Sequence, residues 1–157
     1  DWEATDFSPK MIAQAKLKPR GAGLHFSVQD ATSLPYADET FDAVLIANAL
    51  HIMPRPEKAL AEIYRVLKPG GKVVILEFSR PRNRIFRALY EFYSYRVLPR
   101  IGGAISHDKR AYEYLPVSVG EFPAPEAFLS LLARAGFSDC RSRSQSFGIA
   151  QIYTGVK

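Results

Sequence analysis

Five polar side chains stand at or just after the ends of the strands expected in this sequence, and the first four of them could bind a nucleoside or move a proton. They are Asp6, Asp30, Asn48, His51 and Glu77. In an open α/β sheet, ligands bind in the crevice at the carboxyl ends of the strands. Each apolar run is of strand length, so we expect these two aspartates, the amide, the imidazole and the glutamate to line one edge of a sheet.

The two aspartates favour an adenosine-containing ligand. A carboxylate at the position of Asp6 can accept hydrogen bonds from two ribose hydroxyls, because it carries two acceptor oxygens. Asp30, after the next strand, could accept from an adenine amine. Each also has a local interpretation: Asp6 precedes the helix start Ser8-Pro9, and Asp30 precedes a turn at Ala31. Either role fits one residue alone; the pair at successive strand ends favours the ligand.

His51 admits two interpretations. A histidine near a helix start is commonly structural, whereas one that directly follows a buried strand is placed for general-base catalysis, with an ordinary pKa of about 6.5. The motifs G-x-S-x-G, H-E-x-x-H and the phosphate-binding P-loop are absent. The single cysteine, Cys140, excludes an internal disulfide and a cysteine-rich zinc site, and it favours a reducing, cytoplasmic setting.

The elements that must position these groups alternate between strands and helices. We expect strands at residues 1–7, 24–28, 41–47, 72–78, 140–147 and 149–156, and helices that begin at Ser8-Pro9 and span residues 56–67, 84–98 and 125–135. Residues 41–47 form an almost continuous apolar run, which predicts a strand buried on both faces. Alternation of this kind predicts an α/β fold with a mostly parallel sheet and an antiparallel C-terminal strand pair.

Length and charge set further bounds. The chain has 157 residues, 47% of them hydrophobic, which fits one globular domain and excludes a disordered or collagen-like chain. The net charge of +5 is concentrated in residues 80–110, where eight basic residues meet only Glu91 and Asp108. Five aromatic residues lie between the arginines. This composition suits a solvated helix with a core-facing aromatic side, an anionic membrane surface, or a nucleic-acid backbone.

Several motifs in this order resemble class I S-adenosylmethionine-dependent methyltransferases. They are residues 6–12 (DFSPKMI), 29–35 (QDATSLP), 41–44 (FDAV) and 64–71 (YRVLKPGG). Residues 76–81 (LEFSRP), 90–99, 111–115 (AYEYL) and 147–150 (FGIA) are similar to the ubiquinone/menaquinone biosynthesis C-methyltransferases. The resemblance implies a Rossmann-like fold and methyl transfer to a ring carbon of a prenylated hydroquinone.

The resemblance also implies roles for single residues and segments. Asp6, with Phe7 and Met11 beside it, would hold the ribose of S-adenosylmethionine. Asp30 and Ala31 would flank the adenine, and Asn48 would lie near the methionine moiety. Residues 80–119 would form a basic, aromatic segment that covers the substrate. Within it, Tyr112 and Tyr114 are our own candidates for contacting the acceptor ring or its oxygens, and packing in the core is an equal alternative for both. Apart from the resemblance, we expect His51 to take the proton from the acceptor, either directly or through a water that Asp30 helps to orient.

Two departures from the family pattern shape these expectations. The family's first strand and glycine-rich loop would precede Asp1, so we expect residues 1–157 to be a single, N-terminally truncated methyltransferase domain that binds the cofactor poorly alone. The family usually has an Arg-Asn pair where this chain has His51-Ile52, which leaves the quinone acceptor less specified than the methyl transfer.

The alternatives are an O- or N-methyltransferase of another small molecule or lipid, and a non-catalytic partner that docks on a membrane-bound complex. The expected partners are a prenylated quinol, an anionic membrane surface and a second copy in a homodimer. The expected location is the cytoplasm, with the protein peripheral to the inner membrane. No nucleic acid and no metal are expected.

Overall fold

The chain folds as strands and helices in an α/β order in a computed structural model that describes residues 1–18, 23–100 and 117–157. The strands are β1 (Trp2–Asp6), β2 (Leu24–Val28), β3 (Phe41–Ala47), β4 (Leu67–Phe78), β5 (Ser138–Gln145) and β6 (Ala150–Val156). The described α-helices are α1 (Pro9–Lys16), α2 (Pro56–Val66), α3 (Arg84–Phe92) and α6 (Pro125–Arg134). Short helical turns lie at Leu50–Ile52, Tyr93–Val97 and Ser146–Gly148.

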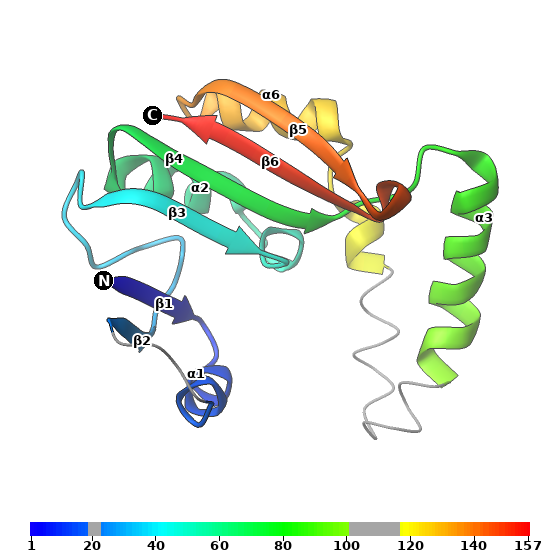
Figure 1. Cartoon of the computed structure of the whole chain (residues 1–157), viewed down its shortest axis with the longest axis horizontal. Helices are drawn as coiled ribbons and strands as arrows, with labels where there is room; N and C mark the ends of the chain where they lie inside the picture. Colours follow the sequence, from blue (N-terminus) through cyan, green and yellow to red (C-terminus); the bar gives the residue numbers. More distant parts are fainter. Residues whose placement is uncertain (19–22, 101–116) are drawn as a thin grey trace.

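The strands form two sheets. β1 and β2 pair in parallel, with Asp6 opposite Val28. The other four follow the order β3-β4-β6-β5, in which β3 and β4 are parallel and β6 is antiparallel to both β4 and β5. Figure 1 shows the small β1–β2 sheet below β3, and β6 between β4 and β5. Parallel pairing and an antiparallel C-terminal pair are both as predicted; the division of the sheet is not.

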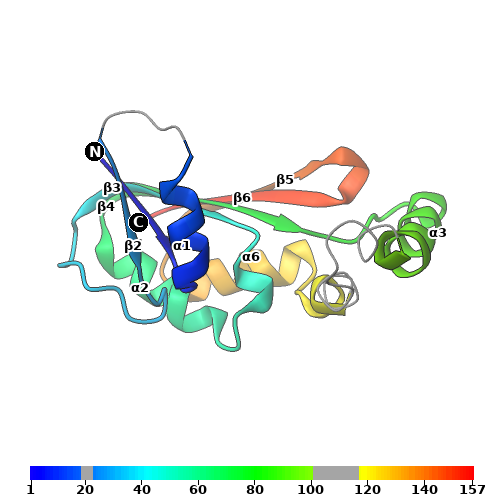
Figure 2. The same ribbon diagram turned by 90° about the horizontal axis from the view of Figure 1, so that it is seen from below.

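The core lies between the four-stranded sheet and the helices α2 and α6, which Figure 2 shows together on one side of that sheet. On this face Val73 and Ile75 of β4 and Tyr153 of β6 are fully buried. Helix α2 contributes a stripe at helical spacing, and α6 contributes two large residues. The buried helix residues are Ala59, Leu60, Ile63, Val66, Phe128 and Leu132.

Local signals explain the helix boundaries. Helix α1 begins where the Ser8 hydroxyl accepts the backbone N–H of Met11, and Pro9 takes the first turn, where its missing N–H costs nothing. Pro56 and Pro125 likewise occupy the first turns of α2 and α6, although no side chain caps the start of either helix. Helix α6 ends at Gly136, whose φ of +105° only glycine adopts readily.

The expectation that residues 41–47 are buried on both faces is wrong. Val44 and Ile46 pack against the core, but Leu45, which points to the opposite face, is 64% exposed. β4 also begins earlier than predicted, at Leu67, with a register irregularity before Lys72 that accommodates the turn at Gly70. The helix predicted over residues 84–98 changes to a π-helical turn at Tyr93–Val97.

Helix α3 stands away from the body of the molecule in Figures 1 and 2. It begins at Asn83, whose side chain accepts the N–H groups of Ile85 and Phe86. Ile85, Leu89 and Phe92 are 80%, 64% and 62% exposed. Within the described part of the chain, no helix is long and apolar enough to cross a membrane.

Candidate functional site

Asp6 is the last residue of β1 and directly precedes the turn into α1. Its Oδ1 accepts the backbone N–H of Ser8 at 2.7 Å, so the helix-entry role foreseen for it is real. Its other carboxylate oxygen has no hydrogen bond to any described residue, and it remains available to a ligand. The apolar side chains of Phe7 and Met11 beside it are 76% and 57% exposed, a degree of exposure that a bound ligand would reduce.

Asp30 lies in the loop that follows β2, and it too serves the chain locally. Its Oδ1 accepts both the backbone N–H and the hydroxyl of Thr32, each at 2.8 Å. These two bonds hold the pKa of Asp30 below its usual value, and the bond from the Thr32 backbone has the larger effect. The group is therefore a carboxylate at neutral pH. The adjacent Ala31 is partly buried against the core.

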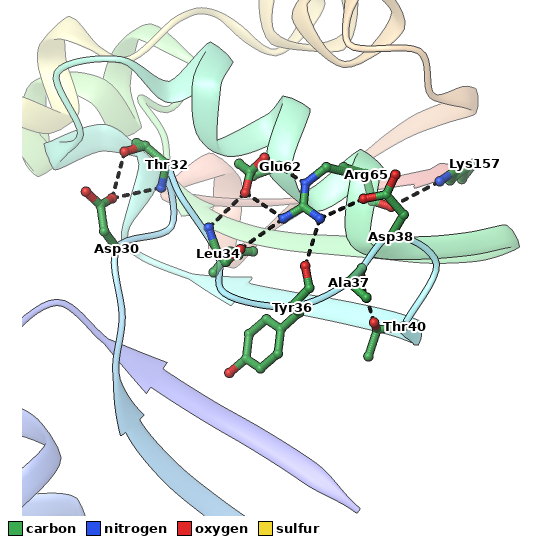
Figure 3. Close-up of polar contacts among 10 residues, drawn as sticks. All are labelled: Asp30, Thr32, Leu34, Tyr36, Ala37, Asp38, Thr40, Glu62, Arg65 and Lys157. Carbon is green, nitrogen blue, oxygen red and sulfur yellow. Dashed lines mark hydrogen bonds and ion pairs between the residues drawn. The ribbon is translucent and has the colours of Figure 1, made fainter.

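The loop that carries Asp30 is fastened to α2 by one carboxylate and one guanidinium (Figure 3). Glu62 accepts the backbone N–H of Leu34 at 2.8 Å, and Arg65 donates two bonds of 2.9 Å to the same carboxylate. Arg65 also donates to the carbonyls of Leu34 and Tyr36 and to Asp38. The loop between β2 and β3 is therefore fixed along its length although it has no regular structure.

His51 lies in the short turn after β3 and is paired with Glu77 of β4. Its Nδ1 is 2.7 Å from Glu77 Oε2, and the two side chains are 3% and 0% exposed. Glu77 Oε1 accepts the backbone N–H groups of Ala49 and Leu50 at 2.9 and 2.7 Å. The ring of Phe78 meets the imidazole edge-on, with centroids 6.0 Å apart.

Asn48 is the first residue beyond β3. Its backbone N–H donates to the Leu76 carbonyl at 2.8 Å, which extends the parallel ladder by one residue. Its φ of +50° is left-handed, a conformation that asparagine tolerates better than most residues. The side chain is therefore set at the point where the chain leaves the strand.

The structure brings together only part of the predicted site. His51 is in direct contact with Glu77, whereas the Asp6 carboxylate, at the end of β1, and the Asp30 carboxylate, two residues after β2, bond to residues of their own turns. Tyr112 and Tyr114 lie outside the described residues. Among the described residues, no group of three or more His, Cys, Asp or Glu could hold a metal ion.

A cavity of about 400 Å³ opens just beyond the carboxyl end of β4. Phe78 and Phe122 give it apolar walls, and Arg80, Arg82 and Arg87 give it a basic rim. Arg82 is paired with Glu126, and Arg87 donates to the Pro81 carbonyl at 2.9 Å. The cavity thus combines aromatic side chains with arginines from the predicted substrate-covering segment.

A family model described as the ubiE/COQ5 methyltransferase family matches residues 2–157. The chain belongs to this family. The resemblance found in the sequence is therefore confirmed over nearly every residue.

Two curated relatives of this ubiE/COQ5 family member illustrate the match. The ubiquinone/menaquinone biosynthesis C-methyltransferase of Geobacter sulfurreducens is 47% identical over 156 residues, covering 97% of this chain and 60% of the relative. The demethylmenaquinone methyltransferase of Thermus thermophilus is 48% identical over 152 residues, covering 96% of this chain and 69% of the relative. The chain thus spans between 60% and 69% of the length of these two proteins.

Solved structures agree with this ubiE/COQ5 assignment at the level of the fold. A Haemonchus contortus phosphoethanolamine N-methyltransferase bound to S-adenosylmethionine superposes with a TM-score of 0.67 at 17% identity, over 99% of this chain and 43% of that one. Human N-acetylserotonin methyltransferase, also bound to S-adenosylmethionine, gives 0.64 at 19% identity, over 99% and 40%. The fold is the Rossmann-like fold of S-adenosylmethionine-dependent methyltransferases.

Sequence reasoning placed Glu77 at a strand end but gave it no role, and it did not single out Glu62 or Arg65. A signal for Glu77 was present. Val73, Ile75 and Glu77 alternate along β4, which puts a carboxylate in a core position. A charged residue in such a position is rarely fully buried without partners.

Proposed function

We propose that this family member transfers a methyl group from S-adenosylmethionine to a ring carbon of a prenylated hydroquinone. The observation that carries the proposal is the pair of carboxylates, Asp6 and Asp30, at the carboxyl ends of adjacent parallel strands. Asp6 lies within the family-like motif at residues 6–12, and Asp30 within the one at residues 29–35. Two relatives that match nearly the whole chain are named as methyltransferases of quinone biosynthesis.

The residues present fit the nucleoside half of the cofactor. Asp6 has one carboxylate oxygen free for the ribose hydroxyls, and Phe7 and Met11 offer exposed apolar surface beside it. Asp30 and Ala31 would border the adenine, and Asn48 the methionine end. A glycine-rich loop, which would let the backbone approach the cofactor closely, does not follow any of the strands that the structure describes.

The chemistry divides between alignment and proton removal. S-adenosylmethionine supplies an already activated methyl group, so the protein has mainly to align donor and acceptor. The acceptor carbon becomes nucleophilic when a neighbouring ring hydroxyl loses its proton. His51 is the proposed base, with Asp30 helping to orient a water. Because only 3% of the His51 side chain is exposed, a water relay suits its position better than direct contact.

The acceptor site we propose is the basic, apolar cavity beyond β4, covered by residues 80–119. The aromatic walls at Phe78 and Phe122 suit a hydroquinone ring, and the arginines of the rim suit a ring oxygen that gains negative charge. Tyr112 and Tyr114 remain candidates for contacting the ring.

Helix α3 is proposed to rest on an anionic membrane, where a prenylated acceptor resides. Ile85, Leu89 and Phe92 follow one side of the helix at spacings of four and three, and all are exposed. Residues 84–100 carry four arginines against one glutamate. An apolar stripe with excess positive charge binds anionic bilayers by burying the stripe and by electrostatic attraction.

The cofactor proposal is tested by calorimetric titration with S-adenosylhomocysteine. One sample is the chain itself, and the second is a fused version in which the first strand and glycine-rich loop expected of the family precede Asp1. We expect only the fused version to bind. Asp6→Asn in the fused version keeps the acceptor for Ser8 but removes the charge, and it should weaken binding about tenfold or more.

Methyl transfer by the fused version is then measured with a prenylated hydroquinone and with non-quinone phenol, amine and lipid acceptors. We expect turnover with the hydroquinone alone. Preference for another acceptor would replace the quinone proposal with an O- or N-methyltransferase. No cofactor binding by either version would leave a membrane-docking protein without catalysis as the better account.

The membrane proposal is tested by flotation with phosphatidylglycerol-rich and with neutral phosphatidylcholine vesicles. Leu89→Ser should reduce binding to the anionic vesicles, and Arg84→Ser should reduce it about fivefold, since one basic residue contributes roughly 1 kcal/mol at such a surface. Leu17→Ser and Arg143→Ser change exposed residues of the same types elsewhere in the chain and should have no effect. Loss of binding in these controls, or α3-dependent dimers without vesicle binding, would contradict the proposal.

A further inference from the structure

Glu77 is a carboxylate without any solvent exposure in a core position at the end of β4. Across the sheet it stands opposite Gln151 of β6, which is 5% exposed. Removing an ionised carboxylate from water is costly unless hydrogen bonds replace the lost hydration. Its partners therefore show what the burial achieves.

Among the described residues, all three hydrogen-bond partners of Glu77 belong to the turn after β3. Two are the backbone N–H groups of Ala49 and Leu50, on Oε1, and the third is His51 Nδ1, on Oε2. An ionised carboxylate is only an acceptor, so Nδ1 must carry a proton in this contact. In the neutral imidazole the lone pair then belongs to Nε2, which has no hydrogen bond to any described residue.

We propose that Glu77 is the positioning residue for His51: it holds the imidazole in the Nδ1–H tautomer and leaves Nε2 as the proton acceptor. The same carboxylate fixes the backbone of the turn to the end of β4, so that the positions of Asn48 and His51 relative to each other are fixed. The catalytic use of Nε2 rests on the proposed methyl transfer. The control of the His51 tautomer by Glu77 does not depend on it.

A glutamine at this position separates the tautomer from the turn. In Glu77→Gln the amide oxygen still accepts from Ala49 and Leu50, while the amide nitrogen donates toward His51. Nδ1 must then accept, and the proton moves to Nε2. A purely structural role predicts little change from this substitution, whereas control of the tautomer predicts a reversal.

The tautomer is read directly by long-range proton–nitrogen correlation spectra of the ¹⁵N-labelled chain, with His51 assigned through His51→Gln. We expect the Nδ1–H form in the unchanged chain and the Nε2–H form in Glu77→Gln. Protected amides at Ala49 and Leu50 in both proteins would show that the turn is retained. Glu57→Gln, on the exposed side of α2, is the matched control and should leave the spectrum unchanged.

An Nε2–H form in the unchanged chain overturns the proposal even if Glu77→Gln does not fold. Failure of the tautomer to reverse in a folded Glu77→Gln variant overturns it as well. Neither reading depends on activity, so the inference can fail while the proposed function stands.

Kinetics of the fused version supply the functional half of the test. Glu77→Gln and His51→Gln should each lower kcat about a hundredfold with little change in the KM for S-adenosylmethionine, the loss expected for general-base catalysis. The double variant should lose no more than either single one, because the two residues act as a unit. Loss in His51→Gln without loss in Glu77→Gln would overturn the role of Glu77. No turnover in the unchanged fused version would refute the proposed function instead.

Discussion

The Glu62 carboxylate has a structural role that links the loop of Asp30 to helix α2. Arg65 and the Leu34 backbone donate to it, and the first of these bonds lowers the pKa of Glu62 below its usual value. A group with a lowered pKa in the folded state stabilises the fold above its unfolded pKa, near 4.3, and loses this contribution as the pH falls through the folded value.

Glu62→Gln should therefore destabilise the chain near neutral pH by about 1 to 2 kcal/mol, because the charged acceptor for Arg65 is lost. Near pH 3 the unchanged chain and the variant should converge. Urea unfolding at both pH values measures this difference. Asp42→Asn is the control: Lys68 also lowers the pKa of Asp42, but its side chain is 87% exposed, so the free energy of unfolding should scarcely change. An equal loss for Glu62→Gln at both pH values would contradict the ionic role.

Gly136 and Gly70 separate two costs of replacing glycine. Both have positive φ, of +105° and +77°. A Cβ on Gly136 would lie 2.9 Å from the Tyr64 ring, whereas one on Gly70 would meet nothing within 4 Å. Gly70→Ala should cost about 1 kcal/mol for its left-handed backbone, and Gly136→Ala should cost at least 1 kcal/mol more. Urea unfolding of the two variants measures both costs, and equal destabilisation would show that the Tyr64 ring yields freely.

At the scale of elements, an aromatic stack joins α3 to the turn between β5 and β6. Phe86 of α3 and Phe147 of the β5–β6 turn lie nearly parallel with centroids 5.0 Å apart. Phe147 and its neighbours Ser146 and Gly148 all have positive φ. The backbone at Phe147 is therefore strained, and its side chain, which is 79% exposed, stacks on the helix.

Phe147→Gly and Phe147→Ala should both loosen α3, since each removes the stack. The glycine variant should nonetheless be more stable than the alanine variant by about 1 kcal/mol, because glycine adopts positive φ without strain. Amide exchange of α3 and urea unfolding give the two readouts. If α3 exchanges unchanged in both variants, other contacts hold the helix, and the stack is incidental.

The elements were largely predictable from sequence where the signal is local. Local residues indicate where helices start, which face is buried and where they end. Examples are Ser8-Pro9 at a start, the apolar stripe from Ala59 to Val66 on a face, and Gly136 after an end. The exposed face of β3 was not predictable, because an apolar run such as residues 41–47 reports only the tendency to be buried. Whether a second layer covers Leu45 depends on other segments.

The candidate site was predictable in the same measure. Strand ends gave Asp6, Asp30, Asn48 and His51, because position after an apolar run is a local pattern. The Glu77–His51 contact joins residues 26 apart in sequence, and the pairing follows from the register of β3 against β4. The role of Arg65 could not be predicted either, because its partners lie in the loop at residues 34–38, which has no regular sequence pattern.

At the scale of the whole molecule, the two sheets each end in a strand with an unpaired edge. β1 pairs only with β2, and β3 pairs only with β4, among the strands that the structure describes. Unpaired backbone groups along such edges readily accept another strand. A parallel strand between β1 and β3 would join the sheets and bring Asp6 and Asn48 to a common edge, where the proposed cofactor site needs them.

The fused version tests this arrangement by amide hydrogen exchange. In the chain alone, amides on the outer edges of β1 and β3 should exchange rapidly, because none of the described strands pairs with those edges. In the fused version, alternate amides of both strands should gain protection together, as parallel pairing on two sides requires. β5, at the far edge of the larger sheet, is the internal control and should not change. Protection that appears on β1 alone would mean that the added strand extends the smaller sheet without joining the two. Asp6 would then remain apart from Asn48, and the cofactor site would have to be assembled in another way.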